Sequence, residues 1–359
     1  MVTYSVPGQI QVYGWDTYRI KVGNVILDTV VSFDAKRTNH KTTGTSTIFV
    51  ADEYGELYDD IGFLDEIEIY IQDPDNFFVP NKVWGGWLED RIYAQGNDHV
   101  LRITGKEYSS ALFDKNFTRS YATSTDIATI SNDIVTDDGT LSTEDLPAST
   151  TKFLSLDFDK ERHWDALDRI TESTGYEFGV SLEQKVYLRD KDNAPLSPDT
   201  ITLGDNMIVT QQTSSGKDIA TDITVQGSTS GVSSNVVNSD AESAYGRKRE
   251  LYTVFQQGEN TTTTQETANS IRDKQSTELK KFQIDTAFLP YTEPNDLITV
   301  TVEGTELEDD YKVLEIEWRL QNNANITSRV TLNQTEASDT DVLSNLAKRY
   351  NTAEKKVYA

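Results

Sequence analysis

A helical pattern followed at once by a strand hairpin, at residues 160–190, constrains the fold of this chain most. Trp164, Leu167 and Ile170 recur three residues apart, which predicts a short amphipathic helix with one apolar face. Asp159 precedes this helix and is the side chain expected to cap its first turn. The segment is therefore expected to pack its apolar face against a neighbouring element.

The hairpin follows directly after Gly175, which supplies the left-handed residue that commonly ends a helix. Apolar and polar residues alternate over 176–180, Glu183 and Gln184 form a polar turn, and the apolar stretch 186–188 returns. Because an isolated hairpin is only marginally stable, helix and hairpin are expected to form one small α+β unit.

The composition indicates a folded, strongly acidic chain. Its 359 residues favour two to three units, and 10% aromatic residues argue against disorder. There are 33 Lys and Arg against 59 Asp and Glu, a net charge of −26, so the surface is expected to repel duplex DNA. With no cysteine, the chain has neither disulfides nor thiolate chemistry.

The acidity has two interpretations, which do not exclude each other. Proteins of salt-loving organisms carry surplus carboxylates, because concentrated ions screen the repulsion between them. A negative surface also suits a channel through which a polyanion slides without binding. The chain has neither a signal-like start nor an apolar run of membrane-spanning length, which predicts synthesis in the cytoplasm and no membrane insertion.

Two strand-rich halves flank the helix–hairpin segment. In the first, residues 18–22, 66–72 and 100–105 alternate, which predicts a sandwich or partly closed barrel. In the second, strands are expected at 207–212, 219–226, 249–255, 297–302, 311–320 and 328–332. Further helices are expected at 125–135, 264–282 and 338–359, and a loop at 227–243.

No catalytic motif stands out. The three histidines are far apart, so no metal-binding pair is expected, and His163 is interpreted as a solvated residue at a helix start. The Asp137-Asp138-Gly139 stretch is expected to form a solvated turn rather than a calcium loop, because the spaced ligands are missing. Pairs of neighbouring carboxylates do not indicate a catalytic site here, because 59 acidic residues form such pairs by chance. No cofactor is predicted, and the chain is expected not to be an enzyme.

Trp84 and Trp87 flank two glycines, and two interpretations are open. Tryptophans beside glycines are typical of a core in which two backbones approach closely. Exposed tryptophans would instead stack on sugar rings, and the chain would then be a carbohydrate-binding adhesin. A glycoside hydrolase is a third, weaker hypothesis, because it needs two carboxylates at a set distance.

The order of these segments resembles the tail hub, or baseplate hub, proteins of long-tailed viruses. The resemblance is carried by the Trp-Gly-Gly-Trp-Leu stretch at 84–88, by residues 124–135 and by residues 162–188. It implies two barrel-like domains per subunit and a homotrimer, whose six similar domains match a sixfold tail tube above and a threefold tip below. Together with the acidity it suggests a tailed virus of a haloarchaeon.

The expected fold is a β-dominated α+β fold, with two barrel-like β domains, an inserted small α/β unit and a C-terminal helix. The first barrel-like hub domain spans residues 1–120 and the inserted unit 121–200. The second hub domain, with an internal helix, spans 201–335, and the C-terminal helix 336–359.

The expected function is a structural virion protein at the distal end of a tail, surrounding a DNA channel. Its implied partners are tail tube protein, distal tail protein, tip or fibre proteins and possibly tape measure protein, while viral DNA passes without specific binding. The candidate lumen-facing carboxylates are Asp65, Glu66, Glu68, Glu303, Glu306, Glu308, Asp309 and Asp310. The cations Lys348, Arg349, Lys355 and Lys356 either complement the end of the terminal helix or dock on an acidic partner.

Overall fold

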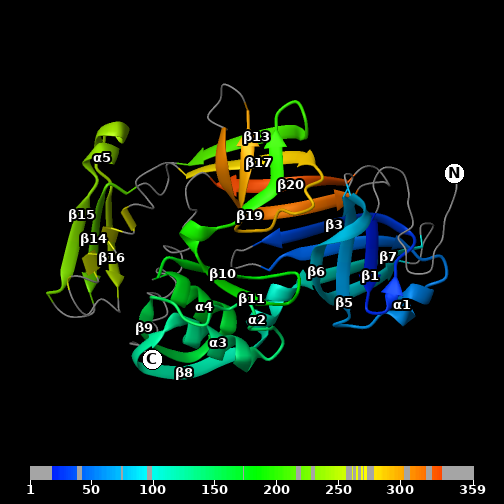
Figure 1. The fold of residues 1–359 in the computed structure, drawn as a ribbon, viewed down its shortest axis with the longest axis horizontal. Coiled ribbons are helices and arrows are strands. Elements are labelled where there is room, and N and C mark those ends of the chain that lie inside the picture. Colours follow the sequence, from blue (N-terminus) through cyan, green and yellow to red (C-terminus); the bar gives the residue numbers. More distant parts are fainter. Residues whose placement is uncertain are drawn as a thin grey trace. The chain divides into compact units, whose positions relative to one another are not determined.

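The computed structural model describes residues 18–38, 43–73, 76–94, 99–172, 174–215, 220–227, 231–255, 261, 264–265, 268–269, 271–272, 279–302, 308–320 and 326–333. They belong to two compact units (Figure 1). Unit 1 is Met1–Thr210 with Gln283–Leu332, and unit 2 is Gln211–Phe282 with Asn333–Ala359.

Strands dominate both units, which confirms the β-dominated α+β class. The strands are β1 (Tyr18–Val22), β2 (Val25–Ile26), β3 (Val30–Thr38), β4 (Thr45–Ala51), β5 (Glu66–Asp73), β6 (Asn76–Ala94), β7 (Val100–Glu107), β8 (Asn116–Asp126), β9 (Phe153–Arg162), β10 (Tyr176–Val180), β11 (Val186–Asp190), β12 (Leu196–Thr202), β13 (Met207–Ser215), β14 (Asp222–Gly227), β15 (Ser233–Val237), β16 (Glu250–Phe255), β17 (Leu279–Ala287), β18 (Leu297–Thr301), β19 (Glu308–Leu320) and β20 (Ile326–Asn333). The helices are α1 (Glu56–Asp60), α2 (Ala111–Asp114), α3 (Ile127–Asp138), α4 (His163–Glu172) and α5 (Ser239–Tyr245), with short 3₁₀ turns η1 (Tyr108–Ser110) and η2 (Lys191–Asn193).

A 13-stranded sheet forms the frame of unit 1. Its main path runs β13-β17-β20-β19-β3-β4-β7-β6-β5-β1-β2, and β18 joins β12 to β19. Along β7 buried and more exposed residues alternate, as expected for a sheet with one face against a core. The alternation read from residues 18–22, 66–72 and 100–105 is thus confirmed by β1, β5 and β7.

The two strand-rich halves of the sequence meet in this one sheet. Antiparallel pairing of β3 with β19 runs from Thr38 opposite Glu315 to Phe33 opposite Leu320. This pairing satisfies the backbone N–H and C=O groups that would otherwise form open sheet edges. Trp318 of β19 is buried, and its indole N–H donates to the Leu289 carbonyl at 3.0 Å.

The segment between the halves forms a small module of three helices, α2, α3 and α4, and two strand pairs, named here the insert (residues 111–190). Helix α3 is capped at its start by Asp126, whose Oδ1 accepts the Ala128 N–H at 2.9 Å, and at its end by Gly139 with φ 71°. The hairpin β10–β11 and the ribbon β8–β9 complete it. The helix predicted at 125–135 and the hairpin after Gly175 are both confirmed.

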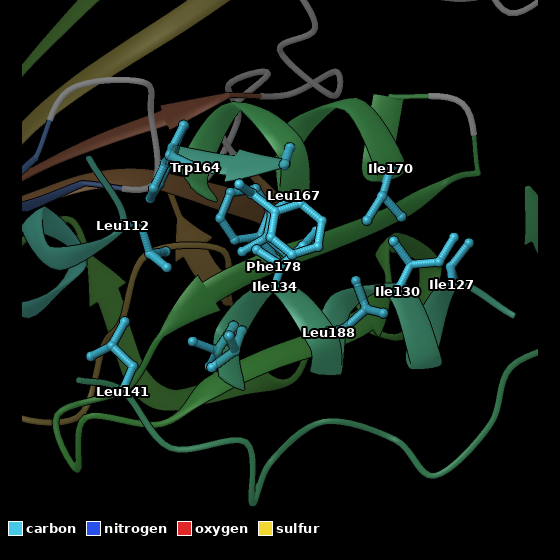
Figure 2. Close-up of a cluster of buried hydrophobic side chains, with 14 of the residues drawn as sticks. Leu112, Ile127, Ile130, Ile134, Leu141, Trp164, Leu167, Ile170, Phe178 and Leu188 are labelled. Atoms are coloured by element: carbon cyan, nitrogen blue, oxygen red, sulfur yellow. The ribbon is translucent and has the colours of Figure 1, made fainter. Parts of the chain in front are cut away.

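The insert has its own hydrophobic core (Figure 2). The apolar face predicted for α4, namely Trp164, Leu167 and Ile170, packs inward as expected and is almost completely buried. The Trp164 ring stacks on Phe113 with centroids 4.9 Å apart and meets the edge of Phe178 at 4.7 Å. Helix and hairpin thus stabilise each other, as the sequence predicts.

Two details of the helix–hairpin prediction are wrong. Asp159 does not cap α4, because β9 continues to Arg162 and the helix starts at His163. The turn is also longer than two residues: the Ser181 N–H donates to the Lys185 carbonyl, so the reversal spans 181–185. Pairing with β8 extends β9 beyond the local signal, whereas at the hairpin the paired strands end earlier than the two-residue turn requires.

Unit 2 is built on the three-stranded sheet β15-β14-β16. The loop predicted at 227–243 is wrong, since it contains β15 and α5, with Asn238 Oδ1 accepting the Ala241 N–H at 3.0 Å. The helix predicted at 264–282 is too long, because the described residues from 264 to 272 are helical but β17 begins at Leu279. The C-terminal helix predicted at 336–359 lies outside the described residues.

Replacing a core residue of α3 tests the insert core. Ile134→Ala removes a fully buried side chain and should lower the free energy of unfolding by about 2–5 kcal/mol. The control Thr129→Ala, at an exposed position of the same helix, should change it by less than about 0.5 kcal/mol. Urea unfolding followed by tryptophan fluorescence measures both, and equal effects would contradict the described core.

Candidate functional site

The predicted acidic residues on β5 lie in a charge-compensated cluster. Glu68 pairs with Lys82 at 2.8 Å and with Lys21 at 3.3 Å, and accepts the Tyr70 hydroxyl at 2.9 Å. Burial opposes the charge, but the bonds from Lys82, Tyr70 and Lys21 hold the pKa of Glu68 below its usual value. This carboxylate is therefore neutralised locally.

The neighbouring carboxylates also have partners within the fold. Glu66 accepts hydrogen bonds from the Tyr108 hydroxyl and, at 2.9 Å, from Gln184 Nε2 of the β10–β11 turn. Asp65 Oδ2 accepts the Gly62 N–H at 2.7 Å and so closes a tight turn before β5. The first group of candidate lumen residues thus also stabilises its own loop and strand.

The second acidic group lies on β19, separated from β5 within the sheet by β3, β4, β7 and β6. Asp309 and Asp310 are exposed, and the Thr299 hydroxyl donates to Asp310 Oδ1 at 2.6 Å. Glu308 begins the strand, while Glu303 and Glu306 lie outside the described residues, as do Lys348, Arg349, Lys355 and Lys356. The described carboxylates therefore form two separate groups.

The tryptophans of the Trp-Gly-Gly-Trp stretch pack inside the fold. This is the first of the two interpretations, a core in which two backbones approach closely. Trp84 is completely buried, and its indole N–H donates to the Lys36 carbonyl at 3.0 Å. A Cβ atom on Gly86 would lie 2.0 Å from the Lys106 carbonyl oxygen, so only glycine fits there. Trp87 packs edge-on against Tyr108 with centroids 5.1 Å apart. Trp84 is thus unavailable for stacking on a sugar.

His163 is fully buried, so its interpretation as a solvated residue is wrong. Its Nε2 lies 2.9 Å from Asp137 Oδ2, and its ring lies 6.1 Å from that of Phe117. The solvated turn expected at residues 137–139 is also wrong, because Asp137 and Asp138 belong to α3 and Asp138 is buried. Asp138 Oδ2 accepts the N–H groups of Thr140 and Leu141. These side chains organise the end of α3 and the start of α4.

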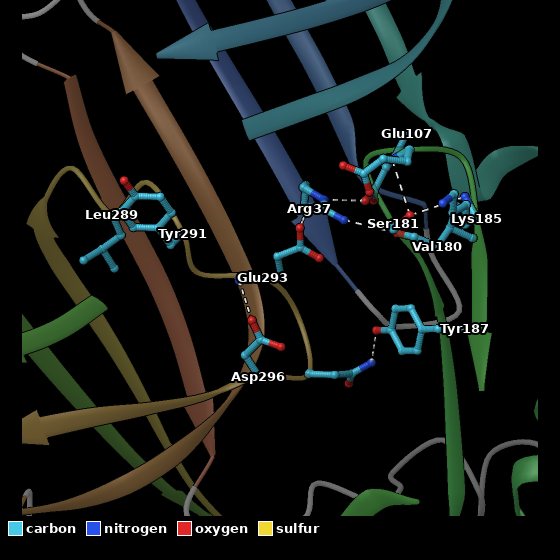
Figure 3. A network of polar contacts seen from close by, with 12 residues as sticks. Arg37, Glu107, Val180, Ser181, Lys185, Tyr187, Leu289, Tyr291, Glu293 and Asp296 are labelled. Atoms are coloured by element: carbon cyan, nitrogen blue, oxygen red, sulfur yellow. Dashed lines mark hydrogen bonds and ion pairs between the residues drawn. The ribbon is translucent and has the colours of Figure 1, made fainter. Parts of the chain in front are cut away.

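A buried ionic network lies where β3, β7 and the insert meet (Figure 3). The sequence pattern did not predict it. Arg37 is only 3% exposed; its Nε donates to Glu107 Oε1 at 2.9 Å and its Nη2 to the Val180 carbonyl at 3.2 Å. Glu293 Oε1 lies 3.3 Å from Arg37 Nη1. We call these four residues the Arg37 junction.

Burial and charge act against each other at this junction. Burial opposes the charge of Arg37, but Glu293 and Glu107 raise the pKa of the guanidinium, which stays charged. Burial also raises the pKa of Glu107, while Arg37 and the N–H of Gly44, 3.2 Å from Oε2, favour its ionised form. The ion pair of Arg37 and Glu107 therefore depends on its further partners, Glu293, the Val180 carbonyl and the Gly44 N–H, to offset the cost of burying two charges.

A second set of contacts ties the hairpin to the β18–β19 region. Glu177 accepts from Arg189 Nε at 2.6 Å and from Lys312 of β19. Arg189 Nη2 donates to the Asn295 carbonyl at 2.9 Å, and Asn295 Nδ2 donates to the Tyr187 hydroxyl at 3.0 Å. The insert is therefore fixed to strands from both halves of the sequence.

A small polar cavity beside the Arg37 junction has room for about one water molecule, too little for a sugar or a peptide. In the described ranges, no three His, Asp or Glu side chains converge as a metal site. No helix among the described residues is both long and apolar enough to span a bilayer.

Comparison with known proteins identifies the fold. No protein-family model and no curated protein match the sequence. A 43 kDa tail protein of prophage MuSo2 from Shewanella oneidensis superposes with a TM-score of 0.69 and 13% identity, over 88% of this chain and 98% of that chain. The chain has the fold of phage tail proteins.

Other tail proteins support the same assignment of fold. A tail protein from Neisseria meningitidis MC58 has a TM-score of 0.66 and 12% identity, covering 90% of this chain and 97% of its own. The prophage tail protein gp18 from Listeria monocytogenes EGD-e gives 0.61 and 12%, covering 92% and 98%. At such low identity the tail-protein fold is what these matches establish.

Breaking the Arg37 junction should destabilise unit 1 strongly. Arg37→Met leaves Glu107 buried without its cation, which should lower the free energy of unfolding by about 3–5 kcal/mol. The matched control Lys36→Met removes a more exposed pair with Glu315 and should cost less than about 1 kcal/mol. The double variant Arg37→Met/Glu107→Leu should lose less free energy of unfolding than the two single variants lose together. Equal losses would contradict the coupling of Arg37 and Glu107.

Asp296 makes the stability depend on pH. Burial and the nearby Glu293 raise the pKa of Asp296 to about 6, with Arg189 acting in the opposite sense. The folded state thus binds a proton more tightly than the unfolded state, whose carboxyl has a pKa of about 3.9, so this contribution is fully present below pH 4 and is lost as the pH rises through 6.

Asp296→Asn removes this dependence, which amounts to at most about 3 kcal/mol. Urea unfolding between pH 4 and 7.5 should therefore show a smaller fall in stability with rising pH for Asp296→Asn than for the unaltered chain. The control Asp205→Asn, at an exposed position, should leave the profile unchanged. Parallel profiles for all three proteins would contradict the role of Asp296.

Proposed function

We propose that the chain is a non-enzymatic structural protein of a virus tail, and specifically the hub at its distal end. The observation that carries this proposal is the superposition on a tail protein over 88% of this chain and 98% of that one. A protein from E. coli, described as a type VI secretion component similar to T4 tail proteins gp27 and gp5, also superposes, with a TM-score of 0.54 and 10% identity over 88% of this chain and 77% of that chain.

In this proposal three copies surround the channel through which DNA leaves the particle. They join the sixfold tail tube to a threefold tip, with distal tail, tip or fibre and possibly tape measure proteins as further partners. The Arg37 junction supports such a role, because it couples the insert to strands of both halves of the sequence.

Of the described candidate carboxylates, Asp309 and Asp310 suit a DNA channel best. They are exposed, and the described residues include no Lys or Arg that pairs with them. Glu66 and Glu68 lie beside Lys82, so they contribute less net negative charge. Uncompensated carboxylates let phosphates pass without making tight contacts.

The carbohydrate-binding alternative loses its main residue, because Trp84 is buried with its N–H satisfied inside the fold. The haloarchaeal source rests on the acidity and the hub-like order of the segments, and it stays a prediction. The tail proteins named above come from bacterial genomes, at identities of 12–13%.

The oligomeric state tests the hub proposal directly. Mass photometry of the purified chain in low and in multimolar salt should show trimers, and negative-stain images should show a threefold ring with a central opening. Acidic subunits repel one another, so the trimer fraction should rise with salt. A monomer at every salt concentration that joins no tail component would contradict the proposal.

A further inference from the structure

The segment between β4 and β5 presents apolar side chains to solvent. Tyr54, Phe63 and Leu64 are 78%, 63% and 77% exposed. They flank the short helix α1, whose own residues include no buried side chain (Figure 1). Large apolar side chains this exposed on one short segment mark an interaction surface.

Contacts with β6 hold this segment in place. Arg91 donates hydrogen bonds to the carbonyls of Tyr58 and Ile61, and its guanidinium carbon lies 4.3 Å from the Tyr58 ring centre and 5.4 Å from that of Phe63. The Tyr93 hydroxyl donates to the Asp52 carbonyl at 3.0 Å. Phe63 is thus pre-positioned, which reduces the entropy lost when a partner binds.

Leu64 has a left-handed backbone, with φ 66°, which is unfavourable for a leucine. Its N–H donates to the Leu88 carbonyl at 3.0 Å, so the conformation is fixed by the fold. Glycine would adopt this backbone without strain. Packing within the described chain does not explain a leucine here, because its side chain is 77% exposed.

The charged side chains of this segment itself are all acidic. Glu53, Glu56, Asp59 and Asp60 are exposed, and residues 52–65 contain no Lys or Arg. Arg91, the cation described in contact with the segment, directs its bonds to carbonyls inside it. We call Tyr54, Phe63, Leu64 and these four carboxylates the acid-rimmed patch. A partner for it must offer apolar side chains together with cations.

The chain itself contains a segment with this chemistry. Residues 347–359 carry four cations, Lys348, Arg349, Lys355 and Lys356, against the single acid Glu354, in a chain with 59 acidic residues. The sequence predicts that Val342, Leu343, Leu346 and Tyr350 form the apolar side of a terminal helix. We propose that the acid-rimmed patch binds the C-terminal segment of a second copy, which deepens the proposed homotrimeric hub and rests on it.

Disulfide trapping tests this contact cleanly, because the chain has no cysteine. Full-length Leu64→Cys and Leu346→Cys variants carrying different tags are mixed, so any mixed disulfide joins two copies. The control replaces Leu64→Cys by Phe153→Cys, since Phe153 is a similarly exposed apolar residue outside the patch, at 55%. The expected yield of the mixed disulfide is at least about tenfold above this control, and equal yields would overturn the proposal.

Charge exchange makes the test independent of cysteine reactivity. Adding Lys348→Glu and Arg349→Glu to the Leu346→Cys chain should reduce trapping to the control level, and adding Asp59→Lys and Asp60→Lys to the Leu64→Cys chain should restore it. A reduction without rescue would overturn the assignment of the patch as the binding site. Circular dichroism of each variant checks that the fold is retained.

The variant Leu64→Gly distinguishes a loss of docking from a loss of folding, and the docking proposal from the hub proposal. Leu64→Gly relieves the backbone strain, so it should unfold at the same or a higher temperature while copy-to-copy association becomes weaker. If Leu64→Gly forms threefold rings as readily as the unaltered chain, the hub stands and the docking proposal falls. If the unaltered chain stays monomeric, the hub proposal falls as well.

Discussion

The buried pair of Arg37 and Glu107 is the interaction on which the architecture of unit 1 depends. Each charge would be costly to bury alone, and the cost is offset because Arg37 also reaches the Val180 carbonyl and Glu293. These partners come from β7, the insert and the segment before β18, so the pair is complete only when all three are assembled. Specific placement of the insert, rather than added stability, is what such a network provides.

The acidic residues of this protein differ in how far nearby cations neutralise them. The net charge of −26 describes the whole chain, yet Glu66, Glu68 and Glu177 each lie beside a lysine. Asp309 and Asp310 project from β19 with no described cation paired to them, and the acid-rimmed patch has an exposed apolar centre. The pairing of Glu66, Glu68 and Glu177 is internal to the fold, whereas repulsion of polyanions by Asp309 and Asp310 and attraction of a cationic apolar segment by the acid-rimmed patch are the roles we propose.

Local pattern predicted the elements well where the pattern was strong. The helix α3, the apolar face of α4, the left-handed Gly175 and the hairpin strands follow from periodicity and capping rules. The errors occur where tertiary contacts override local signals. Pairing with β8 extends β9 past Asp159, and packing of α3 against α4 buries His163.

The sequence by itself determined the β-dominated class, the inserted helix–hairpin and the absence of recognisable catalytic motifs, because hydrophobic periodicity and motif spacing are local properties of a chain. Only the tertiary structure decided that β3 pairs with β19, that Arg37 meets Glu107 and Val180, and that Leu64 is left exposed. Those partners lie 70 and 143 residues from Arg37 along the chain. No local pattern specifies such distant pairs, since their meeting depends on how whole strands align and pack.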